Sequence, residues 1–284
     1  MKNKLFYIAL VVVFLAGLSL LLYPTISNAY NAWLQSNVIT NYSQQVNQLE
    51  QQVFEEQWEK AVDYNTKLTQ RDNPYGLPEQ LREEYTQNLN VADNGIMAYI
   101  EIPSIDVMLP IAHGTSNEVL SRYIGHIEWS SLPVGGVNTH SVISGHRGLP
   151  SSELFTNIDH LELGDVFYIH VLGQTLKYQV CHIAVVEPED QRLLRIEEGQ
   201  DLVTLVTCTP YGINSHRLLV RGIRTDTQGS DLPVDVQVKN EITAIDVVVL
   251  VSVILVAVAV VAFLVVLTGN KKKKGGQQNE KTDP

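Results

Sequence analysis

The stretch Thr204–Gly222, TLVTCTPYGINSHRLLVRG, places a cysteine between two apolar runs. The first run ends at Cys208 and has the pattern of a buried strand. The proline, glycine and asparagine of TPYGIN predict a loop, after which RLLVRG resumes a strand. If the two strands pair in antiparallel fashion, the loop from Thr209 to His216 brings Cys208 close to Arg217. The segment alone leaves two interpretations open: a nucleophilic thiol beside an arginine, or a core cysteine beside a solvated strand end.

A cysteine nucleophile reacts as its thiolate and needs a base or a positive neighbour, most often a histidine. Of the eight histidines, His146 is the strongest candidate, because it ends an apolar strand in SVISGHRGLP. The glycines on either side of it permit close approach of another chain. His140 begins the same strand and is a weaker rival. His170 and His182 fall inside strands, where we expect ordinary structural roles.

Two long apolar blocks flank the chain, at Leu5–Leu22 and Val247–Leu267. Each is long enough to cross a hydrocarbon core of ~30 Å as a helix. The first is longer than the apolar region of most signal peptides, so we predict an uncleaved anchor. Lys2 and Lys4 precede the first block and Lys271–Lys274 follow the second, which predicts that both termini are cytoplasmic.

The segment between the two blocks is then extracytoplasmic. From residue 24 to residue 245 it holds 13 basic and 28 acidic residues, which argues against nucleic-acid binding because that requires a basic surface. The sequence shows no glycine-rich phosphate loop and no Cys/His cluster with metal-ligand spacing, so we predict no cofactor and no metal. Cys181 and Cys208 raise the possibility of a disulfide in this compartment.

The coarse pattern of the chain separates a helical part from a β-rich part. Residues 25–70 are polar with apolar residues at helical spacing, which predicts one or two helices. RDNPYGLPEQL, from Arg71, must end them, and another helix is expected from Pro78. From Gly95 onward short β-rich runs alternate with turn signals, including a hairpin near Gly173, and predict an antiparallel-rich barrel or sandwich. Short helical pieces are expected at residues 116–125 and 151–161.

The motif TLVTC followed by RLLVRG, with SGHRGLP upstream, resembles the sortases, membrane-anchored cysteine transpeptidases of Gram-positive bacteria. YIEIPSIDVMLPIAHGTS and HIEWSSLPVGGVNTHSVISGHRGLP also match that family in order and spacing, so the resemblance covers roughly residues 94–225. It implies a mainly β fold, the eight-stranded sortase β-barrel. It also implies that Cys208 is the nucleophile, His146 the histidine and Arg217 the arginine. The nucleophile must stay free, so we expect Cys181 to be a small buried strand residue without a disulfide.

The second apolar block and HRGLP resemble class C, the pilin-polymerising sortases. That class often carries a lid before the barrel, with an Asp-Pro-aromatic motif over the active site. The matching stretch here is RDNPYG: Pro74 and Tyr75 fit, Asn73 occupies the usual aspartate place, and Asp72 comes one residue early. An asparagine cannot form the ionic contact to Arg217 that an aspartate would. The resemblance therefore implies a lid near Cys208 with a weaker hold.

The resemblance implies acyl transfer without a cofactor. Cys208 would attack an LPxTG-like sorting signal between Thr and Gly, and the acyl group would pass to an amine, a pilin lysine in class C. The partners are thus LPxTG-bearing pilins or surface proteins and the membrane, and the sequence predicts no oligomeric state. One alternative is a housekeeping-type sortase that anchors proteins to peptidoglycan, and another is a non-catalytic adhesin or sensor domain. A papain-like protease is disfavoured because those enzymes place the cysteine before the histidine, whereas His146 precedes Cys208.

These readings divide the chain into seven segments. They are an N-terminal membrane anchor (1–23), a helical stalk (24–70), a lid and connecting helix (71–93), a catalytic barrel (94–225), a tether (226–245), a C-terminal transmembrane helix (246–268) and a cytoplasmic tail (269–284).

Overall fold

The computed structural model describes residues 2–225 and the single residues 252, 255, 256 and 259. The predicted tether, the predicted C-terminal span apart from those four residues, and the predicted tail lie outside the described residues. The described N-terminal residues divide between two compact units, one that reaches to Ala29 and one that starts at Tyr30 and holds the β-barrel.

The N-terminal helix α1 spans Lys2–Asn47 and continues through Pro24. Its segment Ala9–Asn47 is the one helix among the described residues that is long and apolar enough to cross a membrane. This finding agrees with the predicted N-terminal anchor. In the second unit, one face of α1 packs on the barrel: Tyr42 is buried against Tyr99, and its hydroxyl donates to the carbonyl oxygen of Met97 at 2.9 Å.

Two further helices precede the barrel and both bury one face against it. Helix α2 spans Gln51–Thr69 and α3 spans Glu79–Gln87. Tyr64 of α2 and Tyr85 of α3 belong to the main hydrophobic core. The break between the helices falls at the proline- and glycine-containing stretch, as predicted, because that stretch cannot continue a helix.

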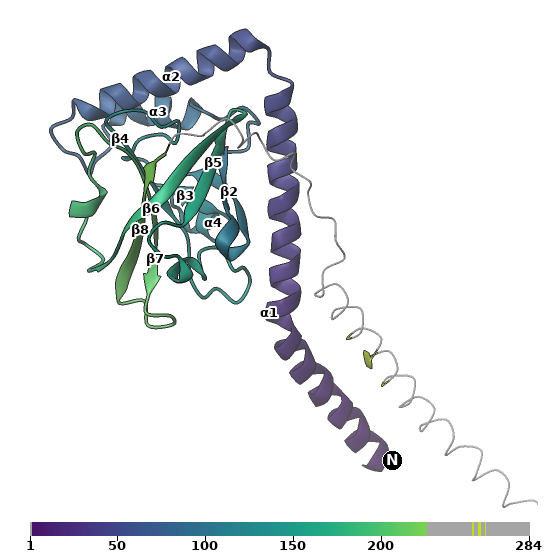
Figure 1. The fold of residues 1–284 in the computed structure, drawn as a ribbon. Coiled ribbons are helices and arrows are strands. Elements are labelled where there is room, and N and C mark those ends of the chain that lie inside the picture. Colours follow the sequence, from purple (N-terminus) through teal and green to yellow (C-terminus); the bar gives the residue numbers. More distant parts are fainter. Residues whose placement is uncertain (1, 226–251, 253–254, 257–258, 260–284) are drawn as a thin grey trace, which may run out of the picture. The chain divides into compact units, whose positions relative to one another are not determined.

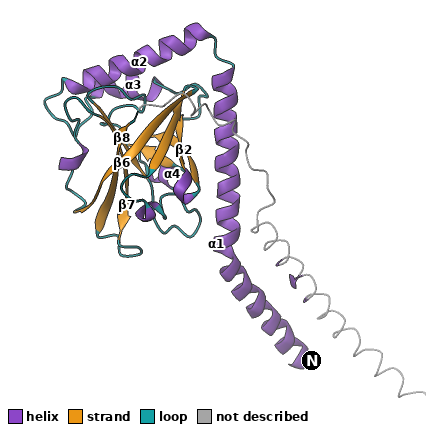
Figure 2. Cartoon of the chain, viewed as in Figure 1, coloured by secondary structure: helices purple, strands orange, loops and turns teal. Residues whose placement is uncertain are grey.

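Eight strands close into a barrel in the order β1-β2-β3-β4-β7-β8-β6-β5 (Figures 1 and 2). Two neighbouring pairs, β2 with β3 and β4 with β7, are parallel, and the other pairs are antiparallel. The predicted barrel is therefore confirmed, and it is a mixed sheet. The strand bounds are β1 Ile96–Ile102, β2 Val107–His113, β3 Ile124–His126, β4 Thr139–Ser144, β5 Val166–Val171, β6 Gln174–Val186, β7 Asp201–Thr209 and β8 His216–Arg224.

Side chains alternate between the two faces of each barrel strand. On β7, Val203 and Leu205 belong to the main core inside the barrel. Val206 belongs instead to a separate apolar cluster that also contains Val142 of β4 and Leu219 of β8. This second cluster lies on the outer face of the sheet formed by β4, β7 and β8.

The connections between strands are less helical than predicted. Residues 151–161 contain only the short 3₁₀ helix η2, Ile158–His160, because Leu154 has a left-handed φ of 40° and the N–H of Phe155 bonds to the carbonyl oxygen of His146. In residues 116–125 the helix is limited to the four-residue α4, Asn117–Leu120, and β3 begins at Ile124. Two further 3₁₀ turns are η1, Pro103–Ile105, and η3, Arg192–Leu194. The predicted hairpin is present between β5 and β6.

Candidate active site

The predicted nucleophile and the predicted arginine face each other across two paired strands. Cys208 on β7 lies directly opposite Arg217 on β8 in an antiparallel register. The Cα atoms of such directly opposed residues are about 4.5–5.5 Å apart, and their side chains share one face. Both side chains are half-buried. The loop between the strands therefore does what the sequence predicts and brings these two residues together.

The histidine follows β4, whose pairing with β7 sets its level. The parallel register of β4 and β7 runs to Ser144 opposite Val206, so its continuation puts His146 level with Cys208. Two hydrogen bonds prolong the pairing beyond the strand. The N–H of Gly145 donates to the carbonyl oxygen of Val206 at 3.0 Å, and the Thr207 hydroxyl donates to the carbonyl oxygen of Gly145 at 2.8 Å. His146 is half-buried and thus accessible from outside the barrel.

Both cysteines are free thiols, so the predicted absence of a disulfide is confirmed. The prediction that Cys181 is buried is wrong, because its side chain is exposed. Leu176, Tyr178 and Val180 of β6 point inward, so the regular alternation of the strand points Cys181 outward, with its Sγ 3.5 Å from the carbonyl oxygen of Arg221. Burial of part of the thiol raises the pKa of Cys181 above its usual value.

An apolar patch adjoins Cys208 on the outer face of the sheet. Its buried members are Val142, Leu194, Val206 and Leu219. Val206 precedes Cys208 by two residues, so both side chains point to the same face, and Leu219 bears the same relation to Arg217. Leu194 comes from the connection between β6 and β7 and covers this patch. These four side chains are nearly fully buried, so they form a packed apolar cluster next to the strand positions of Cys208 and Arg217.

The predicted lid residues contact the loops beside this patch. The Tyr75 ring packs edge-on against Trp129 with centroids 5.7 Å apart, and the Arg195 guanidinium lies over the Tyr75 ring at 5.2 Å. Arg195 Nε also donates to the Tyr75 hydroxyl. Asn73 closes a local turn, since its side-chain oxygen accepts from the Tyr75 N–H at 3.0 Å. Pro74 and Tyr75 are half-buried, while Asp72 and Asn73 are exposed.

The lid has a second attachment through Arg71. Its guanidinium donates to the carbonyl oxygens of Gly76 at 2.6 Å and Trp129 at 2.8 Å, while its Nε donates to that of Leu68. Burial lowers the pKa of Arg71 below the usual arginine value. Arg71 thus joins the end of α2 and the end of the lid to the connection between β3 and β4.

A cavity of about 310 Å³ lies under the lid. His140 lines it, with Nδ1 2.6 Å from the carbonyl oxygen of Arg195 and Nε2 2.7 Å from the Thr204 hydroxyl. Burial lowers the pKa of His140 to about 4, so this side chain is a neutral structural group at pH 7. Leu194 also lines the cavity and belongs to the apolar patch beside Cys208. His140, the weaker candidate for the catalytic histidine, lies six residues before His146. Both of its ring nitrogens are engaged in buried contacts.

The predicted lid residues and Arg217 have different hydrogen-bond partners. Arg217 Nη1 donates to the carbonyl oxygens of Asn214 at 3.3 Å and His216 at 3.1 Å, both in its own loop region. The ring and hydroxyl of Tyr75 contact Trp129 and Arg195, while its N–H bonds to Asn73. Sequence reasoning missed these two lid partners. Nothing local in IEWSSLP or LLRIEEG marks them, because their role arises from two separate loops meeting at the lid.

Within residues 2–225 and the four isolated described residues, no group of three His, Cys, Asp or Glu side chains is arranged to hold a metal ion. The chemistry that these side chains can perform centres on the thiol of Cys208. A free thiol with a histidine and an arginine at its level, on the outer face of a closed barrel, fits the class of cysteine-dependent acyltransferases.

Comparisons with known proteins identify the family. A sequence model of the Sortase domain matches residues 100–225. The crystal structure of sortase C1 from Streptococcus agalactiae superimposes with a TM-score of 0.66 at 44% identity, covering 67% of this chain and 99% of that one. Clostridium perfringens sortase C, solved with the C-terminal cell wall sorting motif, gives 0.60 at 43% identity, covering 67% and 99%. Sortase D of Bacillus subtilis is 26% identical over 164 residues, which are 54% of this chain and 80% of that protein.

The chain belongs to the sortase family. It is a cysteine transpeptidase, and its apolar N-terminal helix is consistent with the membrane anchor that sortases carry.

Proposed function

We propose that this sortase is a pilus-polymerising enzyme that joins an LPxTG-like sorting signal to a lysine of another pilin subunit. The likeness to sortase C structures supports this role. It covers 67% of the chain and so extends beyond residues 100–225, which are the part that matches the Sortase domain. The solved C. perfringens sortase C is described with a C-terminal cell wall sorting motif, which supports a sorting signal as substrate here.

The observation that carries the proposed chemistry is the pairing of Cys208 with Arg217 and the level of His146 beside them. The Cys208 thiolate attacks the threonine carbonyl carbon of the signal. The C–N bond to glycine breaks, a thioester forms, and the His146 imidazolium gives its proton to the departing amine. The lysine amine then attacks the thioester carbonyl and loses a proton to His146. An isopeptide bond forms and the Cys208 thiolate is released.

Arg217 has the role of stabilising the negative oxygen of each tetrahedral intermediate. A guanidinium has five N–H donors, and among the described residues Arg217 uses Nη1, which donates to the carbonyl oxygens of Asn214 and His216. The remaining donors are available for a substrate oxygen, and a charge-assisted bond there is about twice as strong as a neutral one. Arg217 thus acts on the reacting carbonyl from the strand next to Cys208.

The proposed topology keeps the barrel outside the cell with both termini in the cytoplasm. The N-terminal helix supplies one anchor, and the proposed second span at residues 246–268 supplies the other. Substrates that carry sorting signals are themselves attached to the membrane. Holding enzyme and substrate on one surface raises their effective concentration.

The first test replaces the nucleophile. Cys208→Ala should abolish acyl transfer from an LPxTG-type peptide, and mass spectrometry should find a thioester on the parent enzyme alone. Cys181→Ala is the matched control, because it removes the other, exposed thiol and should leave activity unchanged. His146→Ala and Arg217→Ala should each lower kcat by about 10²–10⁴. Acyl transfer by Cys208→Ala at the parent rate would refute the mechanism.

The amine acceptor separates the two sortase roles. Incubation of the enzyme with a purified LPxTG-bearing pilin should give a ladder of covalent multimers on a denaturing gel. Replacement of the acceptor lysines in the pilin should remove the ladder. Single attachment to peptidoglycan fragments, without multimers, would instead establish the housekeeping alternative.

A further inference from the structure

The loop that carries His146 needs a support that Cys208, as a strand residue, does not. His146 lies beyond the end of β4, and the chain from there to η2 has no strand partner except the short bridge between Leu149 and Ser152. Its backbone is held at Gly145 by β7, as described above. The next residue after His146 is Arg147, whose side chain is only 10% exposed.

Arg147 contacts two parts of the chain that are distant in sequence. Its Nη2 forms an ion pair with Asp159 of η2, where the neighbouring Ile158 is fully buried in the main core. Its Nη1 is 3.4 Å from the Thr209 hydroxyl, which it reaches as a weak donor. Thr209 immediately follows Cys208. The guanidinium therefore connects a core-anchored turn to the residue next to the thiol.

The aromatic ring of Tyr211 completes the contact. The Arg147 guanidinium lies 5.7 Å from the centre of this ring. A Cβ at Gly148 would lie 3.1 Å from the same ring, and Gly148 has a left-handed φ of 75°. The loop after Cys208 thus packs on the backbone of the loop after His146, at a position where only glycine fits without strain.

The positive charge of Arg147 is already paired with a carboxylate. Asp159 neutralises it, so Arg147 is not a second donor for an anionic intermediate in the way that Arg217 is. Its Nε is buried and has no hydrogen-bond partner in the part of the chain that the structure describes. A buried arginine with an unpaired Nε is expensive to keep, which points to a role beyond surface solubility.

We propose that Arg147 is a positioning residue for transpeptidation. Through Asp159 on one side and Thr209 and Tyr211 on the other, it fixes the loop that carries His146 relative to the strand end that carries Cys208. This inference rests on the proposed roles of His146 and Cys208. In this proposal Arg147 keeps His146, the proton donor, aligned with the leaving amine. Small misalignments of that kind lower kcat more than they raise KM.

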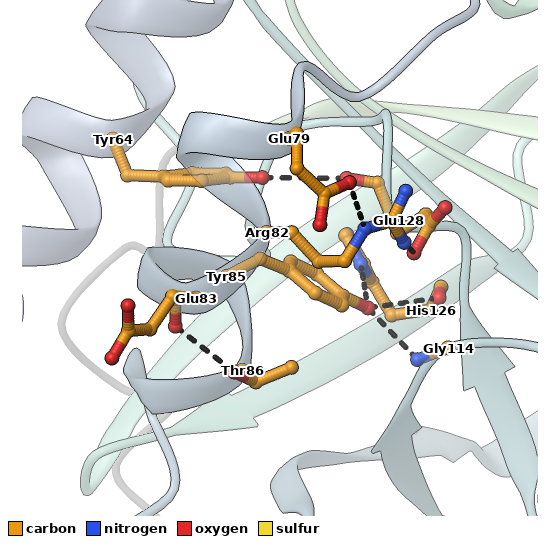
Figure 3. Close-up of polar contacts among 9 residues, drawn as sticks. All are labelled: Tyr64, Glu79, Arg82, Glu83, Tyr85, Thr86, Gly114, His126 and Glu128. Carbon is orange, nitrogen blue, oxygen red and sulfur yellow. Dashed lines mark hydrogen bonds and ion pairs between the residues drawn. The ribbon is translucent and has the colours of Figure 1, made fainter.

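The test compares Arg147→Ala with Arg82→Ala in the full chain, both in a Cys181→Ala background. Arg82 is the control because it is an arginine in ion pairs away from the site, with Glu79 of its own helix α3 and with Glu128 of the connection between β3 and β4 (Figure 3). We expect Arg147→Ala to lower kcat for an LPxTG-type peptide by about 10- to 100-fold with KM changed less than about threefold. Arg82→Ala should stay within about twofold of the parent.

A second readout separates alignment from general loosening. The rate of Cys208 alkylation against pH reports how the thiol interacts with its neighbours, and its midpoint should move in Arg147→Ala and stay in Arg82→Ala. Arg147→Lys keeps the ion pair to Asp159 without the forked guanidinium, so it should recover part of the lost kcat. A parent-like kcat in Arg147→Ala, or a reduced kcat with an unmoved alkylation profile, would overturn the proposal.

Two milder variants decide the matter if Arg147→Ala does not fold. Asp159→Asn keeps the size of the partner and removes its charge. Asp159→Asn and Arg147→Lys, each as a single variant, should lower kcat by about three- to tenfold. Parent-like kcat in both would overturn the proposal. Failure of the proposed function is a different result, because Cys208→Ala would then retain activity.

Discussion

The two helices before the barrel and the segment between them are attached in different ways. Helix α3 is held by Tyr85, whose fully buried hydroxyl is 3.1 Å from the His126 ring and accepts from the N–H of Gly114 at 2.8 Å (Figure 3). Helix α2 is held by Asn65, whose buried amide exchanges two hydrogen bonds with the backbone of Leu132. The predicted lid between them, residues 71–77, rests on the contacts of Tyr75 with Trp129 and Arg195 and on the part-buried hydrogen bonds that Arg71 donates to backbone carbonyl oxygens.

The difference indicates which part can move alone. Buried hydrogen bonds are costly to break because the separated groups stay without water, whereas exposed contacts are replaced by water at little cost. We therefore expect the predicted lid to open as a local event while α2 and α3 remain on the barrel. The following predictions test that division, from the largest expected effect to the smallest.

Acid should weaken the fixed region most strongly. Burial lowers the pKa of His126 to about 3, while an unfolded histidine has a pKa near 6.5. Between these values the unfolded chain binds more protons than the folded chain, so stability is lost as pH falls from about 6.5 towards 3, by up to about 1.4 kcal/mol per pH unit for one such group. Chemical denaturation of the full chain in detergent, repeated across this pH range, measures the slope.

A variant identifies the group responsible. His126→Gln retains a donor for the Ser131 carbonyl oxygen, which lies 2.8 Å from Nε2, and cannot take up the proton. It should have a smaller acid slope than the parent, although the remaining slope from His140 persists. An unchanged slope would show that His126 is not excluded from protonation in the folded state.

The same chemical change in the two regions should have unequal effects. Tyr85→Phe removes the hydroxyl that hydrogen-bonds the His126 ring, and it leaves the N–H of Gly114 without its acceptor. It should therefore lower the free energy of unfolding by about 1–3 kcal/mol. Tyr75→Phe removes a hydroxyl that accepts from a partly exposed arginine and should cost no more than about 0.5 kcal/mol. Thermal and denaturant unfolding measure both. Equal losses would contradict the division between fixed helices and lid.

How far the sequence predicts this molecule depends on whether the signal is local. The pairing of Cys208 with Arg217 follows from one strand–loop–strand pattern, and the break at RDNPYG follows from backbone chemistry. The parallel pairing of β4 with β7, which sets the level of His146, joins segments separated by about 60 residues and leaves no local trace. The same limit applies to Trp129 and Arg195. The outward direction of Cys181, in contrast, follows from the local alternation of Leu176, Tyr178 and Val180 along β6.

The predicted lid gives the most specific effect, because it concerns access to a single thiol. Tyr75→Ala removes the ring between Trp129 and Arg195, and the cation–π and edge-on contacts there are worth about 1 kcal/mol together. Alkylation of Cys208 by a bulky maleimide, in a Cys181→Ala background, should accelerate by about fivefold if the closed lid limits access, and deletion of residues 72–76 should accelerate it further. Arg195→Ala should act in the same direction, because it removes the same contacts from the other side. Unchanged labelling in all three variants would show that the lid covers the neighbouring cavity without controlling the thiol, and the resemblance to lidded class C enzymes would then have no consequence for access to Cys208.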